Sequence, residues 1–189
     1  MAFKKMDFKK AMGWTIIIVM VLSVIGFIGG SFFGNSEETS QKKEYNGFVL
    51  YENYDYWRLQ IGDRQYNFKY FPTDLENITM PMDVSSLLSS DKVYLGYLPN
   101  DTLSVDGELN ELAVVFYVHE LIPQRACLAE EGCPDIPIIN CEENKGIVLR
   151  SGAASLTKDG ECLVMRASNS EELLKLNERV IYSLLGVMK

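Results

Sequence analysis

The sequence predicts an α+β protein, with an N-terminal transmembrane helix followed by one extracytoplasmic domain in which an antiparallel β-meander and hairpins pack with helices. Three observations support this fold class. Residues 13–34 carry no charged side chain. Residues 48–70 alternate apolar and polar side chains with a period of two, as strands with one buried face do. Residues 171–185 repeat apolar side chains at helical spacing, which predicts a helix packed along one face.

The apolar segment fits the thickness of a bilayer. An α-helix rises about 1.5 Å per residue, so residues 14–33 span roughly 30 Å, the thickness of the hydrocarbon core. Lysines mark the cytoplasmic side of a span, and four precede this one: Lys4, Lys5, Lys9 and Lys10. We expect a single-pass cell-membrane protein with its N-terminus in the cytoplasm and its domain outside.

This topology sets the domain boundaries. The predicted parts are a basic cytoplasmic tail (1–12), a transmembrane helix in contact with lipid (13–34), a linker (35–46) and an extracytoplasmic domain (47–189). Two other interpretations of the apolar segment stay open. One is a cleavable signal peptide, because Gly29-Gly30-Ser31 supplies small residues near its end. The other is a pilin-like leader.

The chain beyond the apolar segment is strongly acidic. From residue 35 onward it has 14 lysines and arginines against 25 aspartates and glutamates, a net charge of −11. A field of this sign repels phosphate backbones, so we exclude nucleic acid as a partner. The expected contacts are membrane lipid along residues 13–34 and a protein partner.

Four cysteines lie in the second half of the chain: Cys127, Cys133, Cys141 and Cys162. No two of them have the CxxC spacing that is typical of zinc sites and of thioredoxin-like redox sites. An even number in an oxidising compartment predicts two structural disulfides, for which spacing alone allows three pairings. We favour Cys127–Cys133, which closes a short loop, and Cys141–Cys162, which joins two strands.

The first half of the domain is expected to be mainly β. A tight turn at Gly62-Asp63 joins two strands of the meander, and Pro72 ends its last strand. Thr73 and Glu76 have the spacing of a capping box, which predicts a short helix. The three strands of the expected meander cover residues 48–51, 57–61 and 66–70. A further short helix is expected over 83–89 and a fourth strand over 92–98.

The second half alternates helices and strands. A helix is predicted from Asp106 to the residues before Pro123, and a second from the capping pair Ser168 and Glu171 to near the C-terminus. Glu171 and Lys175 form an i,i+4 pair on the second helix. Two short strands and one hairpin, turning at Asp159-Gly160, are expected over residues 125–128, 136–139, 145–150 and 161–166.

The sequence contains no catalytic or metal-binding signature. His119 is the sole histidine, and no GxSxG surrounds a serine. The acidic residues near the cysteines lack the EF-hand pattern, so we expect neither a metal nor a cofactor. Two sequons make Asn77 and Asn100 candidate glycosylation sites.

Aromatic residues are dense in the meander. If some of them share its outward face, they form an apolar patch suited to a protein partner. The candidate partner surface consists of Tyr56, Trp57, Tyr66, Phe68 and Tyr70.

The lysine-flanked span, the stretch CPDIPIINC (133–141) and the ending ERVIYSLLGVM (178–188) resemble small, single-span, membrane-anchored archaeal proteins that have no assigned function. This resemblance implies a cell-surface setting and no catalytic residues. We therefore expect a non-enzymatic binding or assembly component at the cell surface. The alternative is an extracytoplasmic thiol–disulfide redox protein in which Cys127 and Cys133 cycle.

Overall fold

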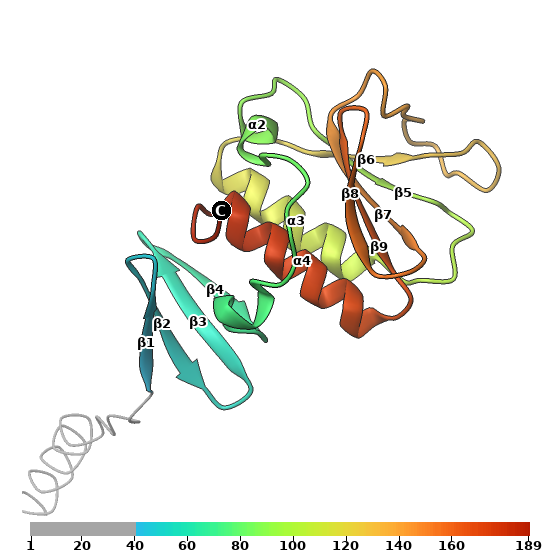
Figure 1. The fold of residues 1–189 in the computed structure, drawn as a ribbon. Coiled ribbons are helices and arrows are strands. Elements are labelled where there is room, and N and C mark those ends of the chain that lie inside the picture. The colour runs from blue at the N-terminus through green and yellow to red at the C-terminus, as the bar shows by residue number, and fades with distance from the viewer. Residues whose placement is uncertain (1–40) are drawn as a thin grey trace, which may run out of the picture. The chain divides into compact units, whose positions relative to one another are not determined.

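The computed structural model describes residues 41–189, which form one unit of two β-sheets and the helices between them (Figure 1). The expected tail, the expected span over 13–34 and most of the expected linker lie outside the described residues. Within 41–189, no helix has both the length and the apolar character needed to cross a bilayer. The α+β class predicted for the domain is confirmed.

The first sheet is an antiparallel meander of four strands in sequential order. They are β1 (Lys42–Tyr45), β2 (Phe48–Asn53), β3 (Tyr56–Ile61) and β4 (Arg64–Phe68). Asn46 and Gly47 both have positive φ, +49° and +83°, as the tight β1–β2 turn requires. The expected linker over 35–46 therefore ends too late, because its last residues form β1 and give the meander a fourth strand.

The second sheet has five strands in the order β6-β5-β7-β9-β8, and only the β8–β9 pair is antiparallel. Its strands are β5 (Tyr94–Tyr97), β6 (Gln124–Cys127), β7 (Gly146–Ser151), β8 (Ser155–Asp159) and β9 (Cys162–Ala167). The expected hairpin of residues 145–150 with 161–166 is wrong, because β7 and β9 run parallel. The strand expected over 136–139 is reduced to one bridge between Cys127 and Ile138.

Four helical segments complete the fold: η1 (Pro72–Leu75), α2 (Ser85–Leu88), α3 (Asp106–Val118) and α4 (Ser170–Leu184). The cap of α4 lies one residue later than its sequence predicts. Asn169 Oδ1 accepts the Glu172 backbone N–H at 2.9 Å, and Glu172 accepts the Ser168 N–H at 2.9 Å. The expected Glu171–Lys175 pair forms at 3.3 Å.

Helices α3 and α4 lie between the two sheets (Figure 1). The main core is continuous from Leu50, Leu59 and Phe68 of the meander, through both helices, to the near face of the second sheet. The far face of that sheet is covered by the disulfide-bearing segment, where Ile139 packs on Val148 and its neighbours. Both sheets are thus positioned by α4, which has residues buried around most of its circumference.

Candidate functional site

A pocket of about 260 Å³ lies where β4 meets α3 and α4. Two carboxylates line it, Glu111 from α3 and Glu178 from α4. We call it the carboxylate pocket. Its other lining residues are Gln65, Tyr66, Asn67, Phe68, Val114, Val115 and Ile181. The apolar members bring both acids into surroundings that are poorer in water than an open surface.

Glu178 is the buried acid of the pocket, with 4% of its surface exposed. Its two carboxylate oxygens accept the backbone N–H groups of Lys69 at 2.7 Å and Tyr70 at 2.9 Å, which ties the end of the meander to α4. Burial raises its pKa to about 7, and the nearby charge of Glu111 adds to the rise, against the opposing effect of the two N–H groups.

Glu111 lies at the exposed rim of the pocket. Partial burial of its carboxylate raises its pKa, and so does the charge of Glu108. The fully buried Asn177 donates from Nδ2 to Glu111 Oε2 at 2.8 Å. Within residues 41–189 neither Glu111 nor Glu178 forms a direct ion pair, although the more distant charge of Lys69 attracts that of Glu178.

Among the described residues 41–189, two further polar atoms in and next to this site are buried without a hydrogen-bond partner. They are the phenol oxygen of Tyr66, which lines the pocket, and Oδ1 of Asn177, a residue behind the pocket lining whose Nδ2 donates to Glu111. A buried polar atom left without a partner costs about 1–3 kcal/mol, so natural folds rarely retain one without a reason. Burial also raises the pKa of Tyr66, which keeps its phenol protonated.

An exposed apolar surface adjoins the pocket. Helix α3 carries apolar residues around most of its circumference, and helices of that kind are normally buried on all sides. Here Val114 and Tyr117 are each 52% exposed, and Ile122, just after the helix, is 75% exposed. We call these three residues the α3 patch. Val114 also lines the carboxylate pocket, so the patch meets the pocket at this residue.

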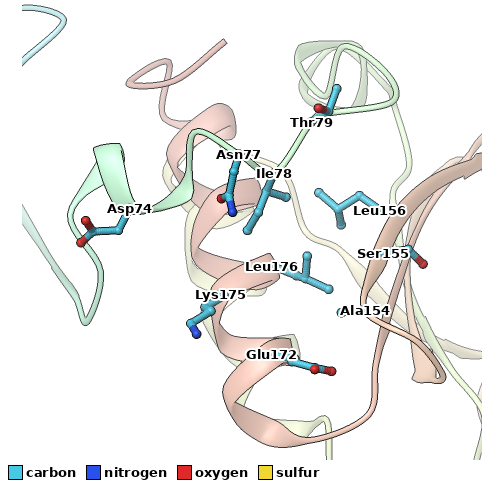
Figure 2. Close-up of a pocket in the computed structure, with 10 residues that line it drawn as sticks. All are labelled: Asp74, Asn77, Ile78, Thr79, Ala154, Ser155, Leu156, Glu172, Lys175 and Leu176. Carbon is cyan, nitrogen blue, oxygen red and sulfur yellow. The ribbon is translucent and has the colours of Figure 1, made fainter.

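A second pocket, of about 470 Å³, lies between α4, residues 74–79 and β8 (Figure 2). Figure 2 shows Ile78, Leu156 and Leu176 facing one another across it. Its charged groups are engaged in local structure. Asp74 accepts the Phe71 N–H at 3.1 Å, and Glu172 accepts from Ser168. We therefore assign its polar groups to capping and place the functional site at the carboxylate pocket.

The five aromatic residues predicted as a partner surface do not share one exposed face. Trp57, Tyr66 and Phe68 are cross-strand neighbours of core residues or belong to the core, and Phe68 is only 3% exposed. Tyr56 lies on the opposite face, where Arg58 donates to its phenol oxygen at 3.1 Å. Tyr70 follows β4 and donates to Glu171 at 3.2 Å. Of these five residues, Tyr66 and Phe68 line the carboxylate pocket.

The four cysteines form two disulfides, Cys127–Cys133 and Cys141–Cys162, the pairing that the spacing favoured. Cys127 and Cys162 are fully buried, whereas Cys133 is half-buried and Cys141 lies in a loop rather than a strand. An incoming thiol would reach the first disulfide through Cys133. Within 41–189 no three potential metal ligands gather, and His119 is an exposed residue at the end of α3.

The two sequons differ in their surroundings. Both asparagines are exposed, and Asn77 lies at the pocket of Figure 2. Asn100 is engaged, because its Nδ2 donates to the Glu131 backbone oxygen at 3.4 Å and the side chain rests against Gly132. The Asn77 amide is therefore the more accessible of the two.

Sequence reasoning did not identify Glu111, Asn177 and Glu178. One signal was present for Glu178, which lies four residues after Leu174 and three before Ile181, within the apolar stripe of α4. Comparisons with protein families, with curated proteins and with solved structures each find no match to this chain. The site must be interpreted from its own chemistry.

Proposed function

We propose that the protein is a membrane-anchored, extracytoplasmic component of the cell surface that binds or assembles with a protein partner and carries out no catalysis. The lysine-flanked apolar segment over 13–34 supports the anchor and its orientation. The two disulfides support a domain in an oxidising compartment, because such bonds persist there and are rare in the cytosol.

The observation that carries the binding role is the α3 patch. Scattered single apolar residues on a surface need no explanation, but a cluster beside a pocket is typical of an interaction site. Val114, which lines the carboxylate pocket, and Tyr117, three residues later on α3, form such a cluster, and the exposed Ile122 follows just after the helix. We therefore move the proposed partner surface from the aromatic meander to this part of α3.

The test is site-specific crosslinking in the membranes of the cells of origin. A photoreactive amino acid replaces Tyr117 in the full-length chain, and the control replaces Tyr51, which is 40% exposed on the outer face of the meander. We expect a discrete adduct from position 117 and none from position 51. Monomer alone at position 117 would refute the α3 patch, and an adduct at position 51 alone would return the interface to the sheet.

The anchor is tested separately in sealed membrane vesicles of known orientation. Protease added on the extracytoplasmic side should digest the domain of the full-length chain and leave a fragment that resists extraction at alkaline pH. Release of an intact domain into the soluble fraction would indicate a cleaved signal peptide. That outcome would remove the anchor without bearing on the α3 patch.

One observation favours the redox alternative, namely that Cys133 is half-buried and therefore within reach of an external thiol. Its partner Cys127 is fully buried, and the acidic Glu130 and Glu131 of the same loop oppose a thiolate. A cycling disulfide should open under mild reductant, whereas a structural one resists. Selective alkylation of Cys127 and Cys133 under mild reduction, with Cys141 and Cys162 unlabelled, would favour the redox function.

A further inference from the structure

We infer that the carboxylate pocket binds an arginine side chain of the protein partner, carried on a segment whose neighbouring residues are apolar and pack on the α3 patch. This inference rests on the proposed binding function and names the chemistry of its partner. It is argued from four properties of the site: charge, hydrogen-bonding capacity, size and surroundings.

The charge of the pocket calls for a cation. Glu111 and Glu178 both line it, and no Lys or Arg among residues 41–189 forms an ion pair with either. Lys69 attracts Glu178 without forming an ion pair with it, and its ammonium lies 5.5 Å from the Tyr70 ring centroid. A carboxylate in a partly desolvated site is stabilised chiefly by a cation with direct hydrogen bonds.

The hydrogen-bonding capacity favours a guanidinium. Arginine has five N–H donors in a planar fork and no acceptor, whereas lysine has a single point of charge. Within residues 41–189, the pocket lining offers two carboxylates together with the unpartnered phenol oxygen of Tyr66. These oxygens outnumber the donors present, and a guanidinium supplies donors in excess.

The size and surroundings favour a side chain over a free small molecule. Small-molecule pockets typically measure about 300–1,000 Å³, and at about 260 Å³ the carboxylate pocket is below this range. A free cation would also leave the α3 patch exposed. A peptide segment with apolar residues on both sides of its arginine would cover Val114 and Tyr117 while the guanidinium entered the pocket.

Proton and arginine compete for the same carboxylates, which gives the binding a pH dependence. Two charged groups act on Glu178, namely Glu111 on α3 and Lys69 after β4. Two phenols also lie near it, that of Tyr66 in the pocket wall and that of Tyr182 on α4. Burial raises the pKa of Glu178 to about 7, so this acid is mostly protonated at pH 5.5. Arginine binding should therefore strengthen between pH 5.5 and pH 8.

The experiment uses the full-length chain in nanodiscs and three probes. The first is the fluorescently labelled peptide Leu-Ala-Arg-Leu-Ala with blocked ends, the second has citrulline in place of arginine, and the third is N-acetylarginine amide. We expect the arginine peptide to bind at least about tenfold more tightly than the citrulline peptide, and more tightly than the free amide. Equal binding of the first two peptides would overturn the inference.

Matched variants separate the pocket from general electrostatics. Glu111→Gln removes one charge but keeps an oxygen for Asn177, and it should weaken the arginine peptide about tenfold. Glu108→Gln removes the same charge one turn earlier on α3, outside the pocket, and should change binding less than about threefold. Equal effects of the two variants would overturn the inference.

The same variants distinguish failure of this inference from failure of the proposed function. If position 117 crosslinks a partner and Glu111→Gln leaves the adduct yield unchanged, the binding role stands and the arginine assignment fails. If no adduct forms at position 117 but the peptide discriminates arginine from citrulline, the pocket chemistry stands and the proposed partner interface fails.

Discussion

Ionisation of Glu178 should destabilise the fold. Its folded-state pKa, about 7, lies above the 4.5 of a free glutamate, so the folded state binds more protons than the unfolded state between these pH values. The stabilisation is fully present below about pH 4.5 and is lost as pH rises through about 7. Stability should therefore fall toward pH 8, although most proteins with paired carboxylates gain stability over this range.

The magnitude follows from the difference between the two pKa values. One unit of pKa difference corresponds to about 1.4 kcal/mol, so a rise from 4.5 to about 7 gives about 3 kcal/mol between pH 4.5 and pH 8. Glu111 adds in the same direction because partial burial raises its pKa too. Acids such as Glu172, whose pKa is lowered by its hydrogen bond from Ser168, lose their contribution only at lower pH.

The assay is guanidinium chloride unfolding of the full-length chain in detergent with its disulfides intact. Replacing Trp14 by Phe leaves Trp57 as the only tryptophan, and its ring packs 4.7 Å from that of Phe71. Trp57 fluorescence then reports the meander. About 2.5 kcal/mol of this change falls between pH 5 and pH 8, so with a slope of about 4 kcal/mol per molar the midpoint should fall by about 0.6 M over that range.

The control variant is Glu178→Gln, which cannot ionise. Its amide oxygen accepts one of the two backbone N–H groups of Lys69 and Tyr70, while its amide nitrogen opposes the other, so it should be less stable than the natural chain at pH 5. Its midpoint should change less with pH, and the two proteins should converge near pH 8. A natural chain whose midpoint is constant or rises from pH 5 to pH 8 would refute the reasoning.

Three further predictions concern the frame around the site. Removing the Cys141–Cys162 disulfide, whose cysteines are 21 residues apart, should lower the free energy of unfolding by about 3 kcal/mol, and removing Cys127–Cys133, with a separation of 6, by about 2 kcal/mol. The measurement is the denaturant midpoint of each paired Cys→Ala variant. Equal costs would contradict the loop-entropy argument. Gly160→Ala should lower the free energy of unfolding by about 3 kcal/mol, because a Cβ at this residue, where φ is +52°, would overlap the Cys141 backbone oxygen. The control is Gly62→Ala, where φ is +60° but the added Cβ meets open space, and it should cost about 1 kcal/mol in the same measurement. In a host that glycosylates asparagine, intact mass should show a glycan at Asn77 before Asn100, and modification of Asn100 alone would contradict the contact of its Nδ2 with Glu131.

Local patterns predicted the elements that have one buried face. The period of two over β3 and β4 and the Gly62-Asp63 turn gave the meander, and the apolar stripe gave α4. Strand β1 was missed because Lys42–Tyr45 is an edge strand with almost no buried surface, and its composition is that of a linker. The Asn46-Gly47 pair was the available signal, since this dipeptide is typical of two-residue hairpins.

The parallel sheet was missed for a different reason. Strands β7 and β9 are buried on both faces, as the unbroken apolar run Ile147-Val148-Leu149 shows, and such runs are typical of parallel sheets. Sequence proximity nevertheless favoured pairing the two as a hairpin. The neighbour of a parallel strand is fixed by contacts distant in sequence, so local periodicity does not specify it.

The site could not be predicted because it depends on which faces meet. The aromatic residues of the meander were visible, but the inner face became known only from the packing of the sheet on α4. Three consecutive polar residues of α4, Asn177, Glu178 and Arg179, are all buried. They lie in the part of α4 that is buried all round, and their partners come from α3, the end of the meander and the C-terminal residues.

These partners explain why binding and stability should be coupled at this site. Glu178 holds Lys69 and Tyr70 of the chain leaving the meander, and Tyr182, one turn later, stacks on Phe68 at 3.9 Å and donates to the Tyr70 oxygen at 2.9 Å. The meander is therefore attached to α4 at the wall of the carboxylate pocket. Ionisation of Glu178 strengthens its two hydrogen bonds, but the desolvation of the buried charge costs more than they return, and an arginine in the pocket would neutralise that charge. The arginine peptide should accordingly raise the unfolding midpoint more at pH 8 than at pH 5, because only at the higher pH is there a buried charge for it to neutralise.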